Sequence, residues 1–407
     1  MTKRGRLALW LGVATYLAAW AFGSKPLYPV AVGLLLVSVA GWAWVRLAAG
    51  PLDLRRNAGR GGEEEGDDVQ VTVDVELAGR VPPASVVLVE RIARLGELAT
   101  PLERFGGRLR GEYVLERVPR GRYAFEESRI VIEDAFGLDR VELPLPTPGS
   151  LLVYPRLVEL DRLFSESGAH AADGRRLLLQ RPSGFDLHSV REYEQGESLR
   201  KVHWRTTARR GQLMVKELED APRDEVAVLL DGDAAAATGV PPDSSFDVQV
   251  RAAGSILRAY VRRGRRSVLI VNSALRETQR VHSDDGDWRA ALELLAAAEA
   301  TSTRPAASLL AEESSPAARA LELVVITARL TAPLVDRLVQ RSLSRRAVSL
   351  VYVDAASFVR SGAAIRPEPD LLRLQGVGVP VAVCRRGDDL AAALGAAAPR
   401  EAALAFT

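Results

Sequence analysis

The sequence predicts a multi-domain protein with a transmembrane helical hairpin, a small β-sandwich and then a doubly wound α/β domain. Three observations lead to this prediction. Two apolar stretches without charged side chains open the chain, short alternating runs broken by Pro and Gly follow, and near-continuous apolar strands then alternate with helical patterns. With 407 residues, of which 47% are hydrophobic and 26% charged, the chain can fold into two or three domains.

The first 50 residues are predicted to form the membrane hairpin. Leu7–Gly23 and Pro26–Val45 carry no charged side chain, and each is roughly 17 to 20 residues long, close to the length that spans a bilayer. Basic residues flank the pair at one end: Lys3, Arg4 and Arg6 before it, and Arg46, Arg55, Arg56 and Arg60 after it. The positive-inside rule therefore predicts a two-pass protein of the inner (plasma) membrane with both termini and the soluble domains in the cytoplasm. A cleaved signal peptide ending near residues 21–23 is the alternative.

Residues 51–66 are rich in Gly and mixed charge, and they are predicted to be a linker. Alternating apolar and polar residues begin at Val69–Leu77 and recur in short runs, which predicts an antiparallel β-sandwich over residues 67–155. The residues Arg120–Tyr123 and Asp134–Gly137 could be read as a polar site. Turns around a buried aromatic side chain are the preferred interpretation, because the glycines stand where turns are needed.

Beyond a connector at 156–183 and an unusual segment at 184–220, residues 221–407 alternate strands with helices. The expected strands are Glu225–Asp233, 266–274, Leu321–Ala328, Ala347–Ala355 and 380–386; the expected helices are Phe246–Arg263, Trp288–Ala298, Pro333–Leu343 and Pro369–Leu374. Strands of this kind form parallel sheets covered on both faces. Ligands bind such sheets beyond the carboxyl ends of the strands, which directs attention to Asp231, Asp233, Thr327 and Asp354.

Residues 184–220, called the signature segment below, interleave aromatic, acidic and basic side chains. They resemble the signature of the Domain of Unknown Function 58 family through Val190, Arg191, Glu192, Tyr193, Gly196, Arg200, Trp204, Ala208, Arg209, Leu213, Val215, Lys216 and Glu217. Glu197 stands where the family usually has Asp. The resemblance implies a von Willebrand factor A-like α/β domain behind a membrane hairpin and a β-rich domain.

The same resemblance implies a non-enzymatic role as an adaptor or assembly factor. Members of this family resemble proteins that work together with MoxR-type AAA+ ATPases and with transglutaminase-like membrane proteins. The sequence carries no phosphate-binding loop of its own, which agrees with a partner that supplies the ATPase activity. The partner-binding or structural candidates are Arg191, Glu192, Tyr193, Gly196, Glu197, Arg200, Trp204, Ala208, Arg209 and Glu217.

Cofactor chemistry has weak support in the sequence. Domains of the von Willebrand A type often hold a divalent cation through an Asp-x-Ser-x-Ser loop, and Mg²⁺ prefers such oxygen ligands. Here Ala235 replaces the second Ser, so Asp231, Asp233 and Thr327 are only weak candidates for a Mg²⁺ site and no cofactor is expected. The single cysteine, Cys384, excludes a disulfide framework and a Cys-based zinc site, and a reducing compartment is the simplest interpretation.

Two other functions remain alternatives. A metal-dependent hydrolase would use the acidic and histidine side chains of the signature segment: Asp186, His188, Glu192, Glu194, Glu197 and His203. Nucleic-acid binding through the arginines and Trp204 ranks lowest, because glutamates in the same segment would repel phosphates and the formal net charge is only +2. An internal salt-bridge and packing network that anchors the segment to the α/β domain ranks ahead of a catalytic site.

Overall fold

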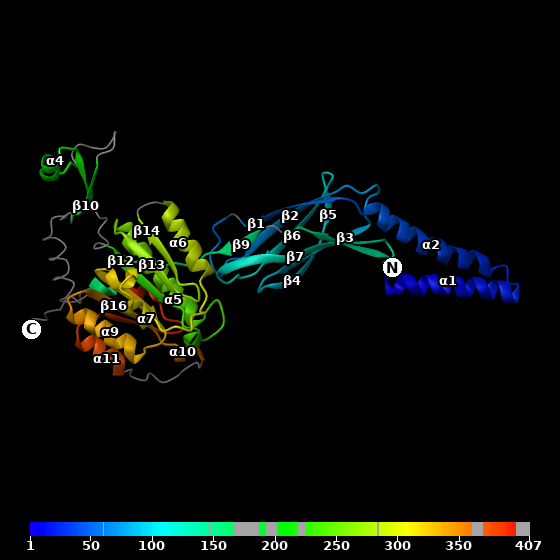
Figure 1. Cartoon of the computed structure of the whole chain (residues 1–407). Helices are drawn as coiled ribbons and strands as arrows, with labels where there is room; N and C mark the ends of the chain where they lie inside the picture. The colour runs from blue at the N-terminus through cyan, green and yellow to red at the C-terminus, as the bar shows by residue number, and fades with distance from the viewer. Residues whose placement is uncertain are drawn as a thin grey trace, which may run out of the picture. The chain divides into compact units, whose positions relative to one another are not determined.

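The computed structural model describes residues 1–59, 61–146, 149–166, 187–192, 202–218, 225–282, 285–359 and 369–395. The chain divides into two compact units, Met1–Tyr154 and Pro155–Thr407, and each is described by itself. Two apolar helices open the chain, and sheet-rich regions follow, first almost wholly β and then mixed α/β, in agreement with the predicted order (Figure 1).

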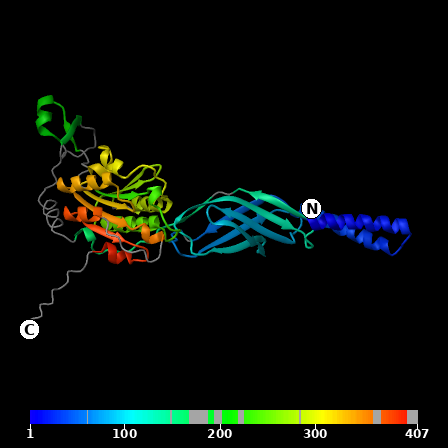
Figure 2. The same ribbon diagram turned by 90° about the horizontal axis from the view of Figure 1, so that it is seen from below.

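The predicted helical hairpin is present as α1 (Lys3–Phe22) and α2 (Leu27–Ala48). The Thr2 side chain caps α1 by accepting a hydrogen bond from the Gly5 N–H at 3.1 Å. Helix α1 ends at Gly23, whose φ of 61° lies in the left-handed region that glycine adopts readily. The two helices lie side by side and antiparallel (Figures 1 and 2). Both are long and apolar enough to cross a membrane.

The prediction that residues 51–66 form a linker is wrong for most of its first half. Residues Leu52–Ala58 form strand β1, which pairs antiparallel along the whole of β2 (Val69–Leu77). Less exposed and more exposed residues alternate along β1, but one of the less exposed positions carries Arg56. Because that residue is charged, a search for alternating apolar residues does not find the strand. Helix α2 therefore runs into the β-rich domain, residues 52–154, almost directly.

The β-rich domain contains two antiparallel sheets, ordered β1-β2-β6-β5 and β4-β3-β7-β8, with β9 paired to β7. The remaining strands are β3 (Ser85–Ile92), β4 (Gly96–Pro101), β5 (Glu103–Phe105), β6 (Arg108–Leu115), β7 (Gly121–Glu133), β8 (Arg140–Leu145) and β9 (Ser150–Val153). Both sheets contribute to one apolar core, to which α2 adds Val45 and Ala48. Alternate residues of β2 face this core, as its sequence pattern predicts.

A buried ion pair lies inside this domain. The Arg56 guanidinium on β1 pairs with the Glu90 carboxylate on β3, and both side chains are nearly inaccessible to water. The same carboxylate accepts hydrogen bonds from the Ser128 hydroxyl at 2.9 Å and the Tyr113 hydroxyl at 2.6 Å. Burial, and then the Glu90 carboxylate, raise the pKa of Tyr113. The guanidinium also lies 3.7 Å from the centre of the Phe125 ring.

The residues from Asp134 to Gly137 form a turn, as the sequence predicted, but Gly121 and Tyr123 lie in strand β7 and not in a turn. Tyr123 is the buried aromatic side chain, and its hydroxyl donates a 2.6 Å hydrogen bond to the Pro119 carbonyl. Asp134 accepts hydrogen bonds from the backbone N–H groups of Phe136 and Asp139, at 3.0 and 2.6 Å, and Gly137 has a φ of 64°. These contacts order the turn between β7 and β8.

The α/β domain contains a six-stranded sheet ordered β14-β13-β12-β15-β16-β17. Its strands are β12 (Val226–Asp231), β13 (Ser267–Asn272), β14 (Glu277–Val281), β15 (Glu322–Thr327), β16 (Ala347–Val353) and β17 (Val381–Cys384). Its helices are α5 (Ser245–Arg262), α6 (Asp285–Ala297), α7 (Ala307–Ala311), α8 (Pro316–Arg319), α9 (Ala332–Leu343), α10 (Ala356–Val359), α11 (Pro369–Gly376) and α12 (Leu390–Leu394).

Strand β12 is apolar throughout except at its end because both faces of the sheet are covered. Val226, Val228 and Leu230 belong to a core shared with α5, whereas Ala227 and Leu229 belong to a second core shared with α7, α8 and α9. The sheet is not wholly parallel, because β14 pairs antiparallel with β13 at the edge. Sequence analysis missed β14 because its run Glu-Thr-Gln-Arg-Val is mostly polar.

Replacing Arg56 with Ala should destabilise the full-length protein in detergent by about 3–5 kcal/mol, because the Glu90 carboxylate stays buried without its cation. Chemical denaturation followed by circular dichroism measures the change. The matched control is Arg55→Ala, one residue earlier, where the side chain is 67% exposed and pairs with Asp53 only at 3.6 Å. The control should change stability by less than about 1 kcal/mol. Equal effects of the two substitutions would contradict the structural role of Arg56.

Candidate functional site

The carboxyl ends of three neighbouring strands bring polar side chains together, and the sequence prediction named two of them, Asp231 and Thr327. Asp231 ends β12, Asn272 ends β13 and Thr327 ends β15. The parallel register aligns these ends, since Asp231 pairs with Asn272 and Leu230 with Ile326. The Asn272 amide donates to Asp231 Oδ1 at 2.9 Å, and the Thr327 hydroxyl donates to Asp231 Oδ2 at 2.8 Å. Both carboxylate oxygens are thereby satisfied.

Asp231 is only 5% exposed, and this burial raises the pKa of its carboxyl group. The hydrogen bonds from Asn272 and Thr327 act in the opposite direction, and the negative charge of Asp233 adds to the increase. The side-chain donors are an amide and a hydroxyl, and among the described residues no cation pairs with this carboxylate. Asp231 is a buried acid that its neighbours stabilise by hydrogen bonding alone.

Asp233 lies next to this cluster but makes different contacts. Its Oδ1 accepts from the Ala235 N–H at 2.9 Å and starts the short 3-10 helix η4 (Ala234–Ala236), while its Oδ2 pairs with the Arg329 guanidinium at 3.2 Å. A cation bound between Asp231 and Asp233 would have to compete with Arg329. Asp354, the fourth predicted residue, directly follows β16 and pairs instead with Arg385 at 3.5 Å.

Metal binding by grouped side chains finds no support in the part of the chain that the structure describes. Within those residues, no three His, Cys, Asp or Glu side chains are grouped closely enough to hold an ion. Asp231, Asp233 and Thr327 do lie together, but with two carboxylates and one hydroxyl they form an incomplete set of oxygen ligands.

The signature segment forms a small structure of its own in its described parts. Strand β10 (Leu187–Glu192) pairs antiparallel with β11 (Met214–Leu218), and the two make a separate two-stranded sheet. Helix α4 (Trp204–Arg210) precedes β11. The His203 ring nitrogen caps this helix by accepting from the Thr206 N–H at 3.2 Å, which gives His203 a structural role.

Helix α4 presents its predicted site residues to solvent. Trp204 is 67% exposed, and Ala208, one turn later, is exposed beside it. Arg205, Arg209 and Arg210 are exposed as well. The expectation that the aromatic side chains form an internal packing network is therefore wrong for Trp204. Among the side chains of this segment whose burial the structure describes, Val202 and Met214 are apolar and buried.

The other predicted residues of the signature segment are only partly visible. Arg191 and Glu192 lie on β10 opposite Val215 and Met214, and Glu217 lies on β11 opposite Ser189. His188, a candidate of the hydrolase alternative, also lies on β10. Six predicted residues lie outside the described part of the chain: Asp186, Tyr193, Glu194, Gly196, Glu197 and Arg200.

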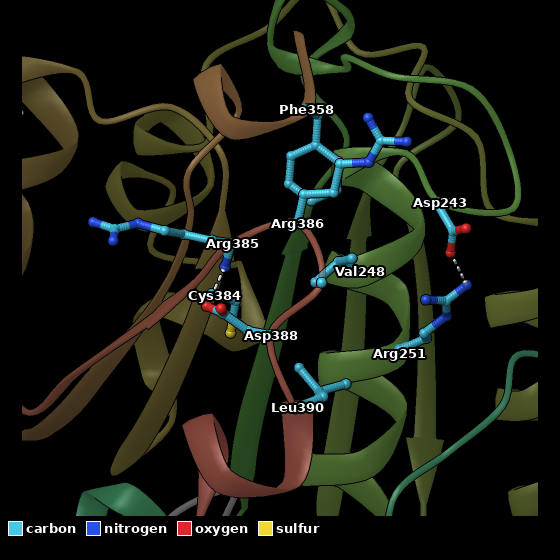
Figure 3. Close-up of a pocket in the computed structure, with 10 residues that line it drawn as sticks. Asp243, Val248, Arg251, Phe358, Cys384, Arg385, Arg386, Asp388 and Leu390 are labelled. Atoms are coloured by element: carbon cyan, nitrogen blue, oxygen red, sulfur yellow. Dashed lines mark hydrogen bonds and ion pairs between the residues drawn. The ribbon is translucent and has the colours of Figure 1, made fainter. Parts of the chain in front are cut away.

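A cavity of about 230 Å³, which sequence analysis did not predict, lies in the α/β domain (Figure 3). It is lined by Asp243, Val248, Arg251, Phe358, Cys384, Arg385, Arg386, Gly387, Asp388 and Leu390. The turn after β17 forms one wall, where the Arg385 N–H donates to the Asp388 carboxylate at 2.8 Å. The only sequence signal was the turn-forming pair Gly387 and Asp388 after the last strand.

Charged side chains of both signs line the cavity. Three arginines and two aspartates line it, and Asp243 pairs with Arg251 at 3.4 Å (Figure 3). No carboxylate lies within ion-pair distance of Arg386 among the residues that the structure describes. Burial, and then the charge of Asp388, raise the pKa of the Cys384 thiol to about 12, so this thiol stays protonated and is a poor nucleophile.

Part of the chain is similar to a family of known sequences. Residues 189–356 match the family described as "Protein of unknown function DUF58". The "Uncharacterized protein YeaD" of Bacillus subtilis (strain 168) is 27% identical over 226 residues, which are 54% of this chain and 53% of that protein. The chain thus spans about half the length of the curated relative it matches.

Two solved structures show weaker similarity. The first is a Pseudomonas fluorescens alkylpurine DNA glycosylase AlkC bound to DNA containing an abasic site analog, with 14% identity, a TM-score of 0.16 and coverage of 30% of this chain and 39% of that chain. The second is Cwp6 from Clostridium difficile, with 12% identity, a TM-score of 0.21 and coverage of 81% and 49%. Scores this low carry no argument about fold or function.

The substitution Asp231→Asn should keep the protein folded and raise its stability at neutral pH by on the order of 1 kcal/mol, because it removes a buried charge. The new amide can donate to the Thr327 hydroxyl, whose proton can turn to the Arg329 carbonyl 3.0 Å away. Since the folded-state pKa of Asp231 is raised, its charge costs stability above that pKa, and the cost disappears as the pH falls through it. The advantage of the variant should therefore shrink on acidification.

Denaturant titrations at a series of pH values measure this difference. The control is Asp336→Asn, since Asp336 is exposed and pairs with Arg373 on the surface. Its stability difference from the wild type should stay small and should not follow the same pH trend. Strong destabilisation by Asp231→Asn at every pH would contradict the hydrogen-bonding scheme.

Cys384 should resist maleimide in the folded protein and react after unfolding, because the thiol is buried and its pKa is about 12. Mass spectrometry of the full-length protein in detergent, with and without denaturant, measures the modification. A second thiol introduced by Leu275→Cys, at an exposed turn, is the positive control and should react at once. Equal rates at both positions would show that the β17 end is open to solvent.

Proposed function

We propose that this protein is a membrane-anchored, non-enzymatic adaptor or assembly factor. In this proposal the two apolar helices span the inner membrane, both termini lie in the cytoplasm, and a von Willebrand A-like α/β domain binds a cytoplasmic partner. The observation that carries the proposal is the exposed Trp204 on α4, within the segment that matches the DUF58 family.

An exposed tryptophan surrounded by arginines is typical of a protein-binding surface. Trp and Arg are the residue types most often found at the energetic centres of protein interfaces. Trp204 and Ala208 are separated by one helical turn, as are Arg205 and Arg209, so α4 offers an apolar stripe beside a basic one. An acidic partner surface with an apolar pocket would complement both stripes.

The class of partner that best fits this role is an AAA+ ATPase of the MoxR type, and a transglutaminase-like membrane protein is a further candidate. An ATPase would supply the nucleotide hydrolysis for which this chain has no phosphate-binding loop. The buried Asp231 cluster supports a binding role for the domain. Its polar groups are satisfied by one another, so they stabilise the strand ends and do not face a substrate.

The proposal predicts that Trp204→Ala lowers capture of the ATPase at least about tenfold, as expected when a central interface residue is truncated. Tagged full-length protein is recovered from membranes in detergent, with and without ATP and Mg²⁺, and the bound proteins are quantified by mass spectrometry. Arg209→Glu should weaken capture as well, because it reverses a charge of the same surface.

The matched control for this experiment is Leu275→Ala. Leu275 is 81% exposed in the α/β domain but lies away from α4 in the sequence, between β13 and β14. This variant should capture the ATPase as the wild type does, and all three variants should keep the wild-type melting temperature. Normal capture by a folded Trp204→Ala protein would refute the role of α4, and recovery of no ATPase by the wild type would refute the proposed partner.

A further inference from the structure

The turn between β7 and β8, residues Asp134–Asp139, contacts the start of the first apolar helix. The Thr2 hydroxyl donates to the Gly137 carbonyl at 2.8 Å, and the Thr2 N–H donates to the Leu138 carbonyl at 3.0 Å. Gly5 packs so closely on this turn that a Cβ atom there would lie 1.9 Å from the Leu138 oxygen. The turn is therefore attached to the first turn of α1.

The same turn also lies against the second helix. A Cβ atom at Gly41 of α2 would lie 3.1 Å from Asp134 Oδ2. Farther along α2, Val45 and Ala48 are buried in the core of the β-rich domain, and the Arg80 N–H donates to the Leu47 carbonyl at 2.8 Å. The charged end of the helical hairpin and this end of the β-rich domain thus form one packed structure (Figures 1 and 2).

Phe136 lies at the tip of this turn and is 69% exposed, although the turn itself is ordered. The two acidic side chains of the turn, Asp134 and Asp139, are buried. Exposed basic residues at this end of the helices include Lys3, Arg4 and Arg6 on α1, and Arg80 before β3, whereas Asp53 on β1 is an exposed acidic residue. Several basic side chains therefore lie on the surface around the hairpin end, where Phe136 is exposed together with Trp42 and Trp44 of α2.

We propose that the Asp134–Asp139 turn is a second membrane contact, in which Phe136 inserts at the headgroup and acyl boundary of a phospholipid bilayer. The inference rests on the membrane anchoring in the proposed function. Lys3, Arg4 and Arg6 cannot enter the hydrocarbon, so the bilayer surface lies near the first turn of α1. The turn that contacts Thr2 and Gly5 is then held at that surface.

The chemistry of the surface selects its lipid partner. Aromatic side chains favour the interface between water and hydrocarbon, and clustered Lys and Arg side chains attract anionic headgroups. A protein partner at Phe136 would have to share this position with the lipid headgroups around α1. A bilayer containing anionic phospholipid is therefore the occupant that the contacts favour.

The test places one fluorophore at a time in the full-length protein, reconstituted into nanodiscs with about a quarter phosphatidylglycerol. Cys384→Ala removes the native thiol, and Phe136→Cys carries an environment-sensitive dye. The matched control is Val114→Cys on β6, which is 53% exposed in the wild type. Val114 pairs with Gln70, at the opposite end of β2 from the residues next to α2.

We expect the dye at position 136 to shift to shorter wavelength and to be quenched several-fold more by headgroup-labelled lipid quenchers than the dye at position 114. Replacing phosphatidylglycerol with a neutral lipid should reduce this difference. Equal quenching at the two positions would overturn the inference. A wavelength shift at position 136 without lipid quenching would also overturn it, since that result means that protein covers the residue.

A third label separates failure of this inference from failure of the anchoring itself. Val32→Cys lies in α2 and is exposed in the isolated chain. Quenching at position 32 by acyl-chain quenchers, without quenching at position 136, would leave the anchoring intact and refute the contact at Phe136. Absence of quenching at both positions would refute the membrane anchoring, and the contact at Phe136 with it.

Discussion

The burial of the last turns of α2 in the core of the β-rich domain is the constraint on which the rest of the first unit depends. Val45 and Ala48 share one core with β2, so the helix cannot move away without exposing apolar surface to water. Strand β1 begins only four residues after α2 ends, so the connection between the two elements is short. This connection places Arg56 at an inward position of β1. The buried Glu90 carboxylate compensates the charge of the Arg56 guanidinium at that position.

The two units bury carboxylates in different ways. Glu90 faces a guanidinium and two hydroxyl donors, so its charge is directly compensated. The side-chain donors to Asp231 are an amide and a hydroxyl, and burial raises the pKa of its carboxyl group. At both carboxylates the polar groups make hydrogen bonds or ion pairs within the protein. Trp204 and Phe136 are exposed instead, and they are the side chains for which we propose contacts with a partner protein and with the bilayer.

Most of the elements could be predicted because their patterns are strong. The two apolar helices, strand β2 and the buried strands of the six-stranded sheet were found within a few residues. Strands β1 and β14 were missed because charged or polar side chains interrupt their alternation, and only pairing with a neighbour makes them strands. For the candidate site, the sequence led to Asp231 and Thr327, but Asn272 and Arg329 become their neighbours only through strand register and folding.

By itself the sequence determined the order of the domains, the apolar hairpin and the position of the signature segment, because composition and periodicity are local properties of the chain. Only the tertiary structure decided which side chains end up exposed. Phe136 and Tyr123 are both aromatic residues near glycine turns, yet one is exposed and the other buried. The difference depends on packing against residues that lie far away in sequence, such as the contact of Gly5 with Leu138, and no local pattern records it.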